Sequence, residues 1–351
     1  MIFASDNWAG ACDAVLDAIA TAGRATPAPA YGADALTARV EARLAEIFEH
    51  EVAVALVPTG TAANALACAL FTPPWGAVVA HEEAHLAVDE AGAPEALTGA
   101  RLLRLPGRRG RLEAEALARR LAETPVGLHH GSLSLLSLTQ ANEYGLVHSP
   151  AEITALCDVA KRHGMAVHMD GARFANAVAR LGAAPADLTW RAGVDVLSFG
   201  GTKGGCFMAE AVILFDPARR EELAFRRKRA GHLVSKHRLI AAQFDAWLAD
   251  GVWLRLAAHA NAMADRLAAG IAASGSARLA WLPQANEVFA HVPDDLAARL
   301  RAAGATFYEW SIAALDADDR PRPGENLCRF VTSFATTADD VDRFVDVLKA
   351  Q

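Results

Sequence analysis

Seven short apolar runs lie in the first 215 residues, with helical patterns between them, and they constrain the fold more than any other feature. Most of the runs lack the polar alternation of a half-exposed strand, so they suit strands that helices cover on both faces. Their spacing indicates β–α–β crossovers and a largely parallel sheet. The predicted strands are residues 52–58, 77–80, 101–105, 131–139, 165–170, 193–199 and 210–215.

The pattern changes after about Arg219, where a basic run at 219–229 precedes long helical stretches that continue to Ala273. Two further apolar runs and a terminal helical pattern follow. We therefore expect an α/β fold with a large domain, in which helices flank a mostly parallel sheet, and a smaller C-terminal α+β domain. The predicted division is residues 1–235 and 236–351, which agrees with the length of the chain.

Charge and cysteine content exclude several classes of protein. The net charge of −7 argues against a general binder of nucleic acid or anionic membranes. No apolar run approaches the ~18–20 residues of a membrane helix, and the start lacks the pattern of a secretion signal. The five cysteines form no CxxC pair. Reduced thiols in a cytoplasmic protein are therefore expected.

One lysine stands at an unusual place. The chain has 34 basic residues, of which only five are lysines, and Lys203 follows an apolar run in "VLSFGGTKGG". Arginine cannot form an imine with an aldehyde, whereas a desolvated lysine amine can. The neighbouring glycines would let backbone approach a ligand closely. A lysine on a surface loop is the alternative interpretation.

An aspartate ends the preceding predicted strand. Asp170 closes residues 165–170, and Lys203 lies past the end of the next strand. Open α/β sheets bind ligands beyond the carboxyl ends of their strands, so both side chains are expected at one edge. Together they suit an aromatic aldehyde cofactor. The lysine amine would bind the aldehyde, and the aspartate carboxylate would keep the ring nitrogen protonated. A turn residue or helix cap is the alternative for Asp170.

A possible phosphate site follows the first strand. In "VPTGTAANALA" a helical pattern begins near Thr61. Gly60, Thr61 and the first free N–H groups could hold a phosphate at the positive end of the helix. A plain strand–turn–helix junction is the alternative.

The stretch "HEEAH" at residues 81–85 matches the letters of a zinc-protease motif, which requires both histidines on one helix. His81 closes an apolar run, so we expect the two histidines to lie on different elements and to bind no metal. A ring-stacking or proton-handling role suits His85 better, and a solvated loop histidine is the alternative.

Several motifs occur in an order that resembles the low-specificity L-threonine aldolases, which are pyridoxal-phosphate enzymes of fold type I, the aspartate-aminotransferase fold. The likeness covers nearly the whole chain and is strongest up to Gly205, where the motifs lie. They are "SDN" (5–7), "AYGADALT" (30–37), "PTGTAAN" (58–64), "HEEAH" (81–85), "HMDGARFANA" (168–177) and "LSFGGTKGG" (197–205).

The resemblance implies roles around the cofactor, pyridoxal 5′-phosphate. Lys203 would be the Schiff-base lysine, and Asp170 would pair with the pyridine nitrogen. Gly60 and Thr61 would hold the phosphate, and His85 would stack on the ring.

The resemblance also implies residues for the substrate. Ser5, Arg173 and Arg329 would hold the α-carboxylate, for which the planar fork of arginine is suited. Tyr31 would lie near the site, with the neighbouring subunit as a candidate source. Lys236 would face the phosphate of a partner subunit, or would be an ordinary solvated lysine.

One segment departs from the family pattern. Many members carry a histidine near the substrate hydroxyl, where this chain has Gln140, Asn142 and Glu143 in "SLTQANEYG". The binding of the β-hydroxyl is therefore left open.

The implied activity is the pyridoxal-phosphate-dependent retro-aldol cleavage of L-threonine, L-allo-threonine and related L-β-hydroxy-α-amino acids to glycine and an aldehyde. His85 or a water that it positions would be the base. The alternatives are a β-eliminating lyase, a racemase, an aminotransferase or a non-catalytic interaction module. A homodimer or homotetramer with shared sites is expected, with a small amino acid as the substrate.

Overall fold

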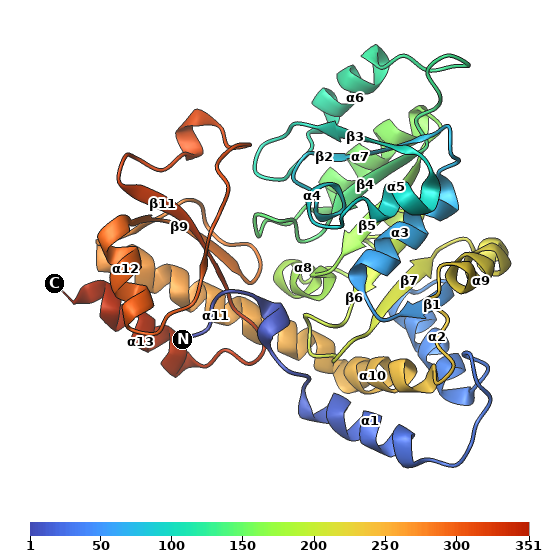
Figure 1. Cartoon of the computed structure of the whole chain (residues 1–351), viewed down its shortest axis with the longest axis horizontal. Helices are drawn as coiled ribbons and strands as arrows, with labels where there is room; N and C mark the ends of the chain where they lie inside the picture. The colour runs from blue at the N-terminus through green and yellow to red at the C-terminus, as the bar shows by residue number, and fades with distance from the viewer. Residues whose placement is uncertain (351) are drawn as a thin grey trace.

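The computed structural model describes residues 1–350, which form a large and a small lobe (Figure 1). The large lobe contains a seven-stranded sheet in the order β1-β7-β6-β5-β4-β2-β3. Each predicted run forms one of its strands, so all seven predictions are confirmed. The strands are β1 Ala53–Val57, β2 Ala77–His81, β3 Arg101–Leu105, β4 Leu135–Thr139, β5 Ala166–Gly171, β6 Val196–Gly200 and β7 Glu210–Leu214.

Strand direction follows the length of the connections. The neighbours β3, β2, β4, β5 and β6 pair in parallel, whereas β7 is antiparallel to both β6 and β1. A parallel return needs a crossover of a dozen or more residues, and the link 201–209 between β6 and β7 is too short for one. The largely parallel sheet is therefore confirmed, with β7 as its exception.

Helices cover both faces of this sheet. Alternate strand residues point to opposite faces, so Val196 packs with α3 while Leu197 packs with α7 and α8 on the other side. Eight helices of the large lobe precede the last strand of the sheet in the chain: α1 Asp13–Arg24, α2 Ala35–Phe48, α3 Gly60–Phe71, α4 His85–Val88, α5 Ala93–Thr98, α6 Ala114–Glu123, α7 Pro150–Arg162 and α8 Phe174–Leu181. Two more come after it, α9 Arg220–Arg229 and α10 Arg238–Leu248.

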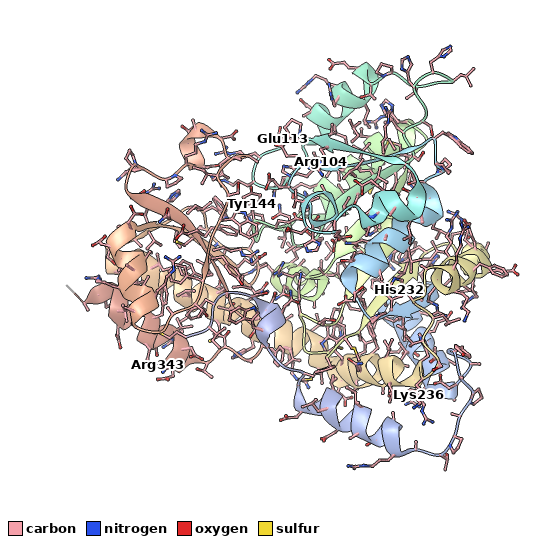
Figure 2. All side chains as sticks on the ribbon, in the orientation of Figure 1. Arg104, Glu113, Tyr144, His232, Lys236 and Arg343 are labelled. Carbon is pink, nitrogen blue, oxygen red and sulfur yellow. The ribbon has the colours of Figure 1, made fainter. Side chains whose placement is uncertain are left out.

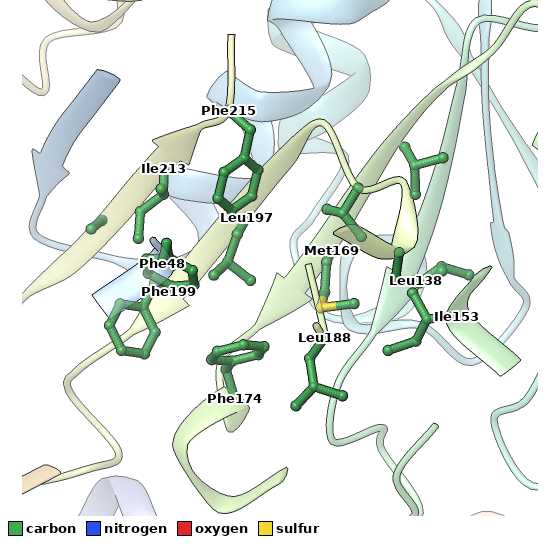
Figure 3. Packing of buried hydrophobic residues seen from close by; sticks show 14 of the residues in the cluster. Phe48, Leu138, Ile153, Met169, Phe174, Leu188, Leu197, Phe199, Ile213 and Phe215 are labelled. Atoms are coloured by element: carbon green, nitrogen blue, oxygen red, sulfur yellow. The ribbon is translucent and has the colours of Figure 1, made fainter. Parts of the chain in front are cut away.

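An aromatic cluster fills the core beneath β6 (Figure 3). Phe199 is fully buried, and its ring centroid lies 6.0 Å from that of Phe48, 5.8 Å from that of Phe174 and 5.3 Å from that of Trp247. The indole N–H of Trp247 also donates to the Gly204 carbonyl at 2.8 Å. The cluster therefore supports the loop that carries Lys203.

The small lobe contains an antiparallel sheet in the order β10-β11-β9-β8, as the predicted α+β pattern requires. Helix α11 runs from the large lobe into the small one (Figure 1). The elements are α11 Val252–Ser274, β8 Arg278–Leu279, β9 Glu287–Pro293, α12 Asp294–Ala302, β10 Tyr308–Glu309, β11 Glu325–Val331 and α13 Ala338–Lys349. Short 3₁₀ turns are η1 Asp6–Trp8, η2 Trp190–Ala192, η3 Pro217–Arg219, η4 Ala249–Gly251 and η5 Ala317–Asp319.

The two ends of the chain meet in the small lobe. Phe3 packs edge-on against Phe344 at 5.3 Å, and its backbone N–H donates to the Thr306 carbonyl at 2.8 Å. In contrast, α10 packs on α1 and α2 in the large lobe. The division at residues 235 and 236 stays a prediction. Within residues 1–350 no helix combines the length and apolar character that crossing a bilayer requires.

Candidate active site

A cavity of about 260 Å³ opens at the carboxyl ends of the central strands. The register places Thr139 of β4 beside Asp170 of β5, and Asp170 beside Ser198 of β6, so the strand ends meet at one edge as predicted. Six of the predicted site residues line this cavity: Gly60, Thr61, His85, Asp170, Arg173 and Lys203.

Asp170 is held firmly at the end of β5. Its Oδ1 accepts from the Ala172 N–H at 3.0 Å, and its Oδ2 accepts from Asn64 Nδ2 at 2.8 Å. Asn64 lies on α3 four residues after Gly60, so both face the cavity from one side of the helix. The sequence reasoning missed Asn64, although this spacing would have indicated it.

His85 begins α4, and a buried carboxylate holds its ring. His85 Nδ1 lies 2.8 Å from Glu90 Oε1, which also accepts from Asn64 Nδ2 at 2.7 Å. The hydrogen bond to Glu90 raises the pKa of His85, and partial burial opposes this rise. A chain of hydrogen bonds thus joins His85 to Asp170 through Glu90 and Asn64. Glu90 was also missed from the sequence.

Lys203 lies in the tight loop after β6 and is half-buried beside the cavity. A Cβ at Gly201 would lie 2.7 Å from the Ala209 carbonyl oxygen, and one at Gly204 would lie 2.7 Å from the Trp247 ring. The glycines are therefore needed for this loop to pack. Glu210 faces the same cavity, and burial raises its pKa to about 7 against the opposing effects of Thr202 and Lys203.

The start of α3 offers two free donors. Thr59 caps the helix by accepting from the Ala62 N–H at 3.2 Å, and its carbonyl accepts from the Ala63 N–H. No acceptor among residues 1–350 takes the N–H groups of Gly60 and Thr61. A Cβ placed on Gly60 would meet no atom within 4 Å. These features fit an anion at the positive end of the helix.

The two predicted arginines share buried carboxylates. Arg173 donates to Asp6 through Nε at 2.8 Å and Nη2 at 3.0 Å, and its Nη2 lies 3.5 Å from Glu287 Oε1. Arg329 Nη1 lies 3.6 Å from the same oxygen, and its guanidinium lies 4.0 Å from the centre of the Trp310 ring. Burial raises the pKa of Glu287, and both arginines oppose that rise.

Asp6 stays ionised in this cluster. Burial would raise the pKa of Asp6, but the charges of Arg173 and Lys203 and hydrogen bonds from Arg173 and Asn286 lower it overall. Ser5 caps the turn that carries Asp6, and its Oγ accepts from the Asn7 N–H at 3.1 Å. Asn7 lines the cavity, whereas Ser5 and Arg329 do not. Ser5 contacts Asn7 of the cavity wall directly, whereas Arg329 is linked to Arg173 of the wall through Glu287.

Tyr31 and Lys236 lie outside the cavity of this chain. Tyr31 is 51 % exposed, and its N–H donates to the Ser235 carbonyl at 3.0 Å. Lys228 Nζ lies 5.1 Å from the centre of the Tyr31 ring. Figure 2 shows Lys236 at the outer edge of the large lobe, close to α10. Both predicted roles depend on another subunit and stay predictions.

Only one of the three polar residues after β4 reaches the cavity. Gln140 and Asn142 bond to backbone groups of neighbouring loops. Glu143 lines the cavity, and its Oε1 accepts from the His85 N–H at 2.8 Å and from Thr139 Oγ1 at 3.1 Å. Burial raises the pKa of Glu143 to about 7, although these hydrogen bonds oppose the rise.

The two histidines of "HEEAH" lie on different elements, as predicted. His81 ends β2, and its Nε2 lies 3.1 Å from the Gly107 carbonyl, whereas His85 begins α4. Across the described residues no group of three or more His, Cys, Asp or Glu side chains is placed to hold a metal ion.

Three larger hollows lie elsewhere. One of about 730 Å³ is lined by Arg109 and Trp281, one of about 950 Å³ by Phe71 and Phe225, and one of about 710 Å³ by Trp75. None of the three combines an amine, a fixed carboxylate and a free helix start. The smaller cavity is therefore the candidate active site.

Most of the chain matches a known protein family. Residues 3–295 match the family described as Beta-eliminating lyase. The low specificity L-threonine aldolase of Pseudomonas aeruginosa is 39% identical over 342 residues, which cover 97% of this chain and 94% of that protein. The enzyme of the same description from Pseudomonas sp. (strain NCIMB 10558) is 39% identical and covers 87% of this chain and 88% of its own. The structure of a threonine aldolase from Leishmania major is similar at a TM-score of 0.91 and 29% identity, and it covers 99% of this chain and 98% of that one.

Proposed function

Because the chain belongs to the beta-eliminating lyase family, among the low-specificity L-threonine aldolases, we propose that it is a pyridoxal-phosphate-dependent carbon–carbon lyase. Its substrates are L-threonine, L-allo-threonine and related L-β-hydroxy-α-amino acids, and its products are glycine and an aldehyde. The observation that carries this proposal is the meeting of Lys203, Asp170 and the free N–H groups of α3 in one cavity.

The cavity residues fit pyridoxal phosphate. Gly60 and Thr61 would hold its phosphate, Asp170 would hold the proton on its ring nitrogen, and Lys203 would bind its aldehyde carbon. His85 would lie against its ring. When bound, the cofactor supplies an electron sink for the electron pair left on Cα as the Cα–Cβ bond breaks.

Arg173 is the proposed anchor for the substrate carboxylate at the cavity wall. Asp6 and Glu287 orient its guanidinium, and Glu287 also lies beside Arg329. Ser5 supports this arrangement by capping the turn that carries Asp6. Fixing the carboxylate fixes the direction of the Cα–Cβ bond, and such orientation supplies a large part of the rate enhancement.

We also propose a homodimer or homotetramer with shared sites in the cytoplasm. Large apolar side chains are exposed near the cavity, with Phe207 58% and Trp8 56% exposed, and a second subunit would cover them. Lys236 and Tyr31 would then reach the neighbouring site. The five cysteines form no disulfide within residues 1–350, which agrees with a reducing compartment.

The test is an aldehyde-release assay with purified protein and added pyridoxal phosphate on L-threonine, L-allo-threonine and L-phenylserine. We expect glycine and aldehyde in equal amounts, and we expect Lys203→Ala to abolish both. The second candidate reaction is β-elimination, which the name of the matching family suggests. That reaction would release ammonia and a keto acid from L-serine and would not release an aldehyde. Aldehyde release that is unchanged in Lys203→Ala would refute the assignment. Formation of a D-isomer would indicate a racemase, and transfer of the amino group would indicate an aminotransferase. Failure to take up the cofactor would indicate a non-catalytic module.

A further inference from the structure

Glu90 lies behind His85 and has no part in the chemistry described so far. Its side chain is 0% exposed, yet it carries a carboxyl group whose burial must be compensated. Its Oε1 lies 2.8 Å from His85 Nδ1 and accepts from Asn64 Nδ2 at 2.7 Å. The contact places the proton on His85 Nδ1 where Glu90 acts as an acceptor, as it does toward Asn64.

His85 is therefore held at two points. Its backbone N–H donates to Glu143 Oε1 at 2.8 Å, and its ring is fixed by Glu90. Its Nε2 contacts no donor or acceptor within the part of the chain that the structure describes, and its side chain is 42% exposed. Because Nδ1 carries the proton, neutral His85 keeps a free lone pair on Nε2 on the open side of the ring.

Asn64 fixes the far side of the network. Its Nδ2 donates one hydrogen to Glu90 and the other to Asp170 at 2.8 Å, so Glu90 cannot swing away without losing its contacts with both Asn64 and His85. The charged groups that act on His85 are Glu90, Asp170 and Lys203. Two of these three are carboxylates, which favour a proton on the imidazole.

We propose that Glu90 is a positioning residue that holds His85 with its proton on Nδ1, so that Nε2 accepts the β-hydroxyl proton of the substrate. This inference rests on the proposed function. The hydroxyl proton moves to Nε2, the oxygen–Cβ bond becomes the aldehyde carbonyl, and the Cα–Cβ bond breaks with its electron pair left on Cα. Cα takes up one proton and His85 releases one to water, so no net proton is consumed.

A direct test observes the His85 ring by NMR in holoenzyme with isotope-labelled histidine, with His85→Gln for assignment. The wild type should show the Nδ1–H tautomer. Glu90→Gln keeps an oxygen acceptor and removes the charge, so the pKa of His85 should fall. Glu90→Ala should shift the ring toward the Nε2–H tautomer. His259, whose Nε2 contacts the Thr336 carbonyl at 2.8 Å, is the internal reference.

The kinetic test measures kcat for aldehyde release against pH. Glu90→Gln should lower kcat about 10- to 100-fold and move the acid limb to lower pH, because a partner behind a working histidine has an effect of this order. Glu83→Gln is the matched control. Glu83 lies in the same stretch of chain as Glu90 but does not line the cavity, and the substitution likewise replaces a glutamate by glutamine. An unchanged tautomer in Glu90→Ala, or an unchanged acid limb in Glu90→Gln, would overturn the inference. A wild type that releases no aldehyde would instead refute the proposed function, while the NMR result would still decide the state of His85.

Discussion

Replacement of Glu143 by glutamine isolates the cost of a buried charge in the cavity wall. Glu143 Oε1 accepts from the His85 N–H and from Thr139 Oγ1, and the amide oxygen of glutamine can accept both bonds. The second oxygen, Oε2, is buried without a partner. Glu143→Gln therefore removes the charge while the local hydrogen bonds are kept.

The magnitude follows from the pKa of Glu143. Burial raises this pKa from an ordinary value of 4.5 to about 7, so the folded protein binds a proton between these pH values that the unfolded chain has lost. The stability that comes from this proton is complete below pH ~4.5 and is lost as the pH rises through ~7. The loss between pH 5 and pH 8 amounts to about 2–3 kcal/mol.

Urea unfolding of the protein without cofactor at pH 5 and pH 8 measures this effect. The free energy of unfolding of Glu143→Gln should gain about 2–3 kcal/mol over the wild type between the two pH values, because glutamine does not titrate. Glu210→Gln should change in the same direction, since burial raises that pKa to about 7 as well. Glu113→Gln, at the exposed start of α6 (Figure 2), is the control and should show no such gain. A gain that does not depend on pH would show that the titration of Glu143 is not its cause.

Three further changes test the packing, the link between the lobes and the phosphate site. Phe199→Ala should lower the free energy of unfolding by about 3–5 kcal/mol in urea, because its ring fills the core beneath β6, and a loss under about 1 kcal/mol would contradict that packing. Asp319 accepts from Arg109 Nε at 2.7 Å, and this contact lowers the pKa of Asp319 to about 2. Asp319→Asn should therefore cost about 2 kcal/mol at pH 7, an effect that disappears as pH falls from about 4 towards 2, and a pH-independent cost would argue against this origin. Gly60→Ala should leave unfolding without cofactor nearly unchanged and weaken pyridoxal phosphate binding in a fluorescence titration. Gly200→Ala should destabilise the protein itself, because its Cβ would lie 2.7 Å from backbone atoms, and equal behaviour of the two variants would contradict the phosphate assignment.

The strands were predictable because each is a short apolar run between helical patterns. The direction of the strands was harder to predict. Strand β7 runs antiparallel to β6 because the connection between them is short, and the sequence prediction did not take the length of that connection into account. Asp170 and Lys203 were predictable from their places at strand ends, since neighbouring parallel strands bring such residues to one edge.

The partners of these residues were not predictable in the same way. Glu90 and Glu143 lie in separate loops and meet His85 only when the chain is folded, whereas the spacing of Asn64 from Gly60 did indicate its place. Asp6 and Glu287, which hold the arginines, are separated by almost the whole chain. Their burial beside guanidinium groups is a property of packing between the lobes, for which a local sequence pattern gives no sign.

The covalent link between Lys203 and the cofactor is the claim on which the proposed chemistry depends. The most direct measurement is borohydride reduction of the protein loaded with pyridoxal phosphate, followed by mass spectrometry of its peptides. We expect one peptide to carry the reduced cofactor on Lys203, and no such peptide from Lys203→Ala. Modification of another lysine, or an equal yield from Lys203→Ala, would show that Lys203 does not bind the cofactor.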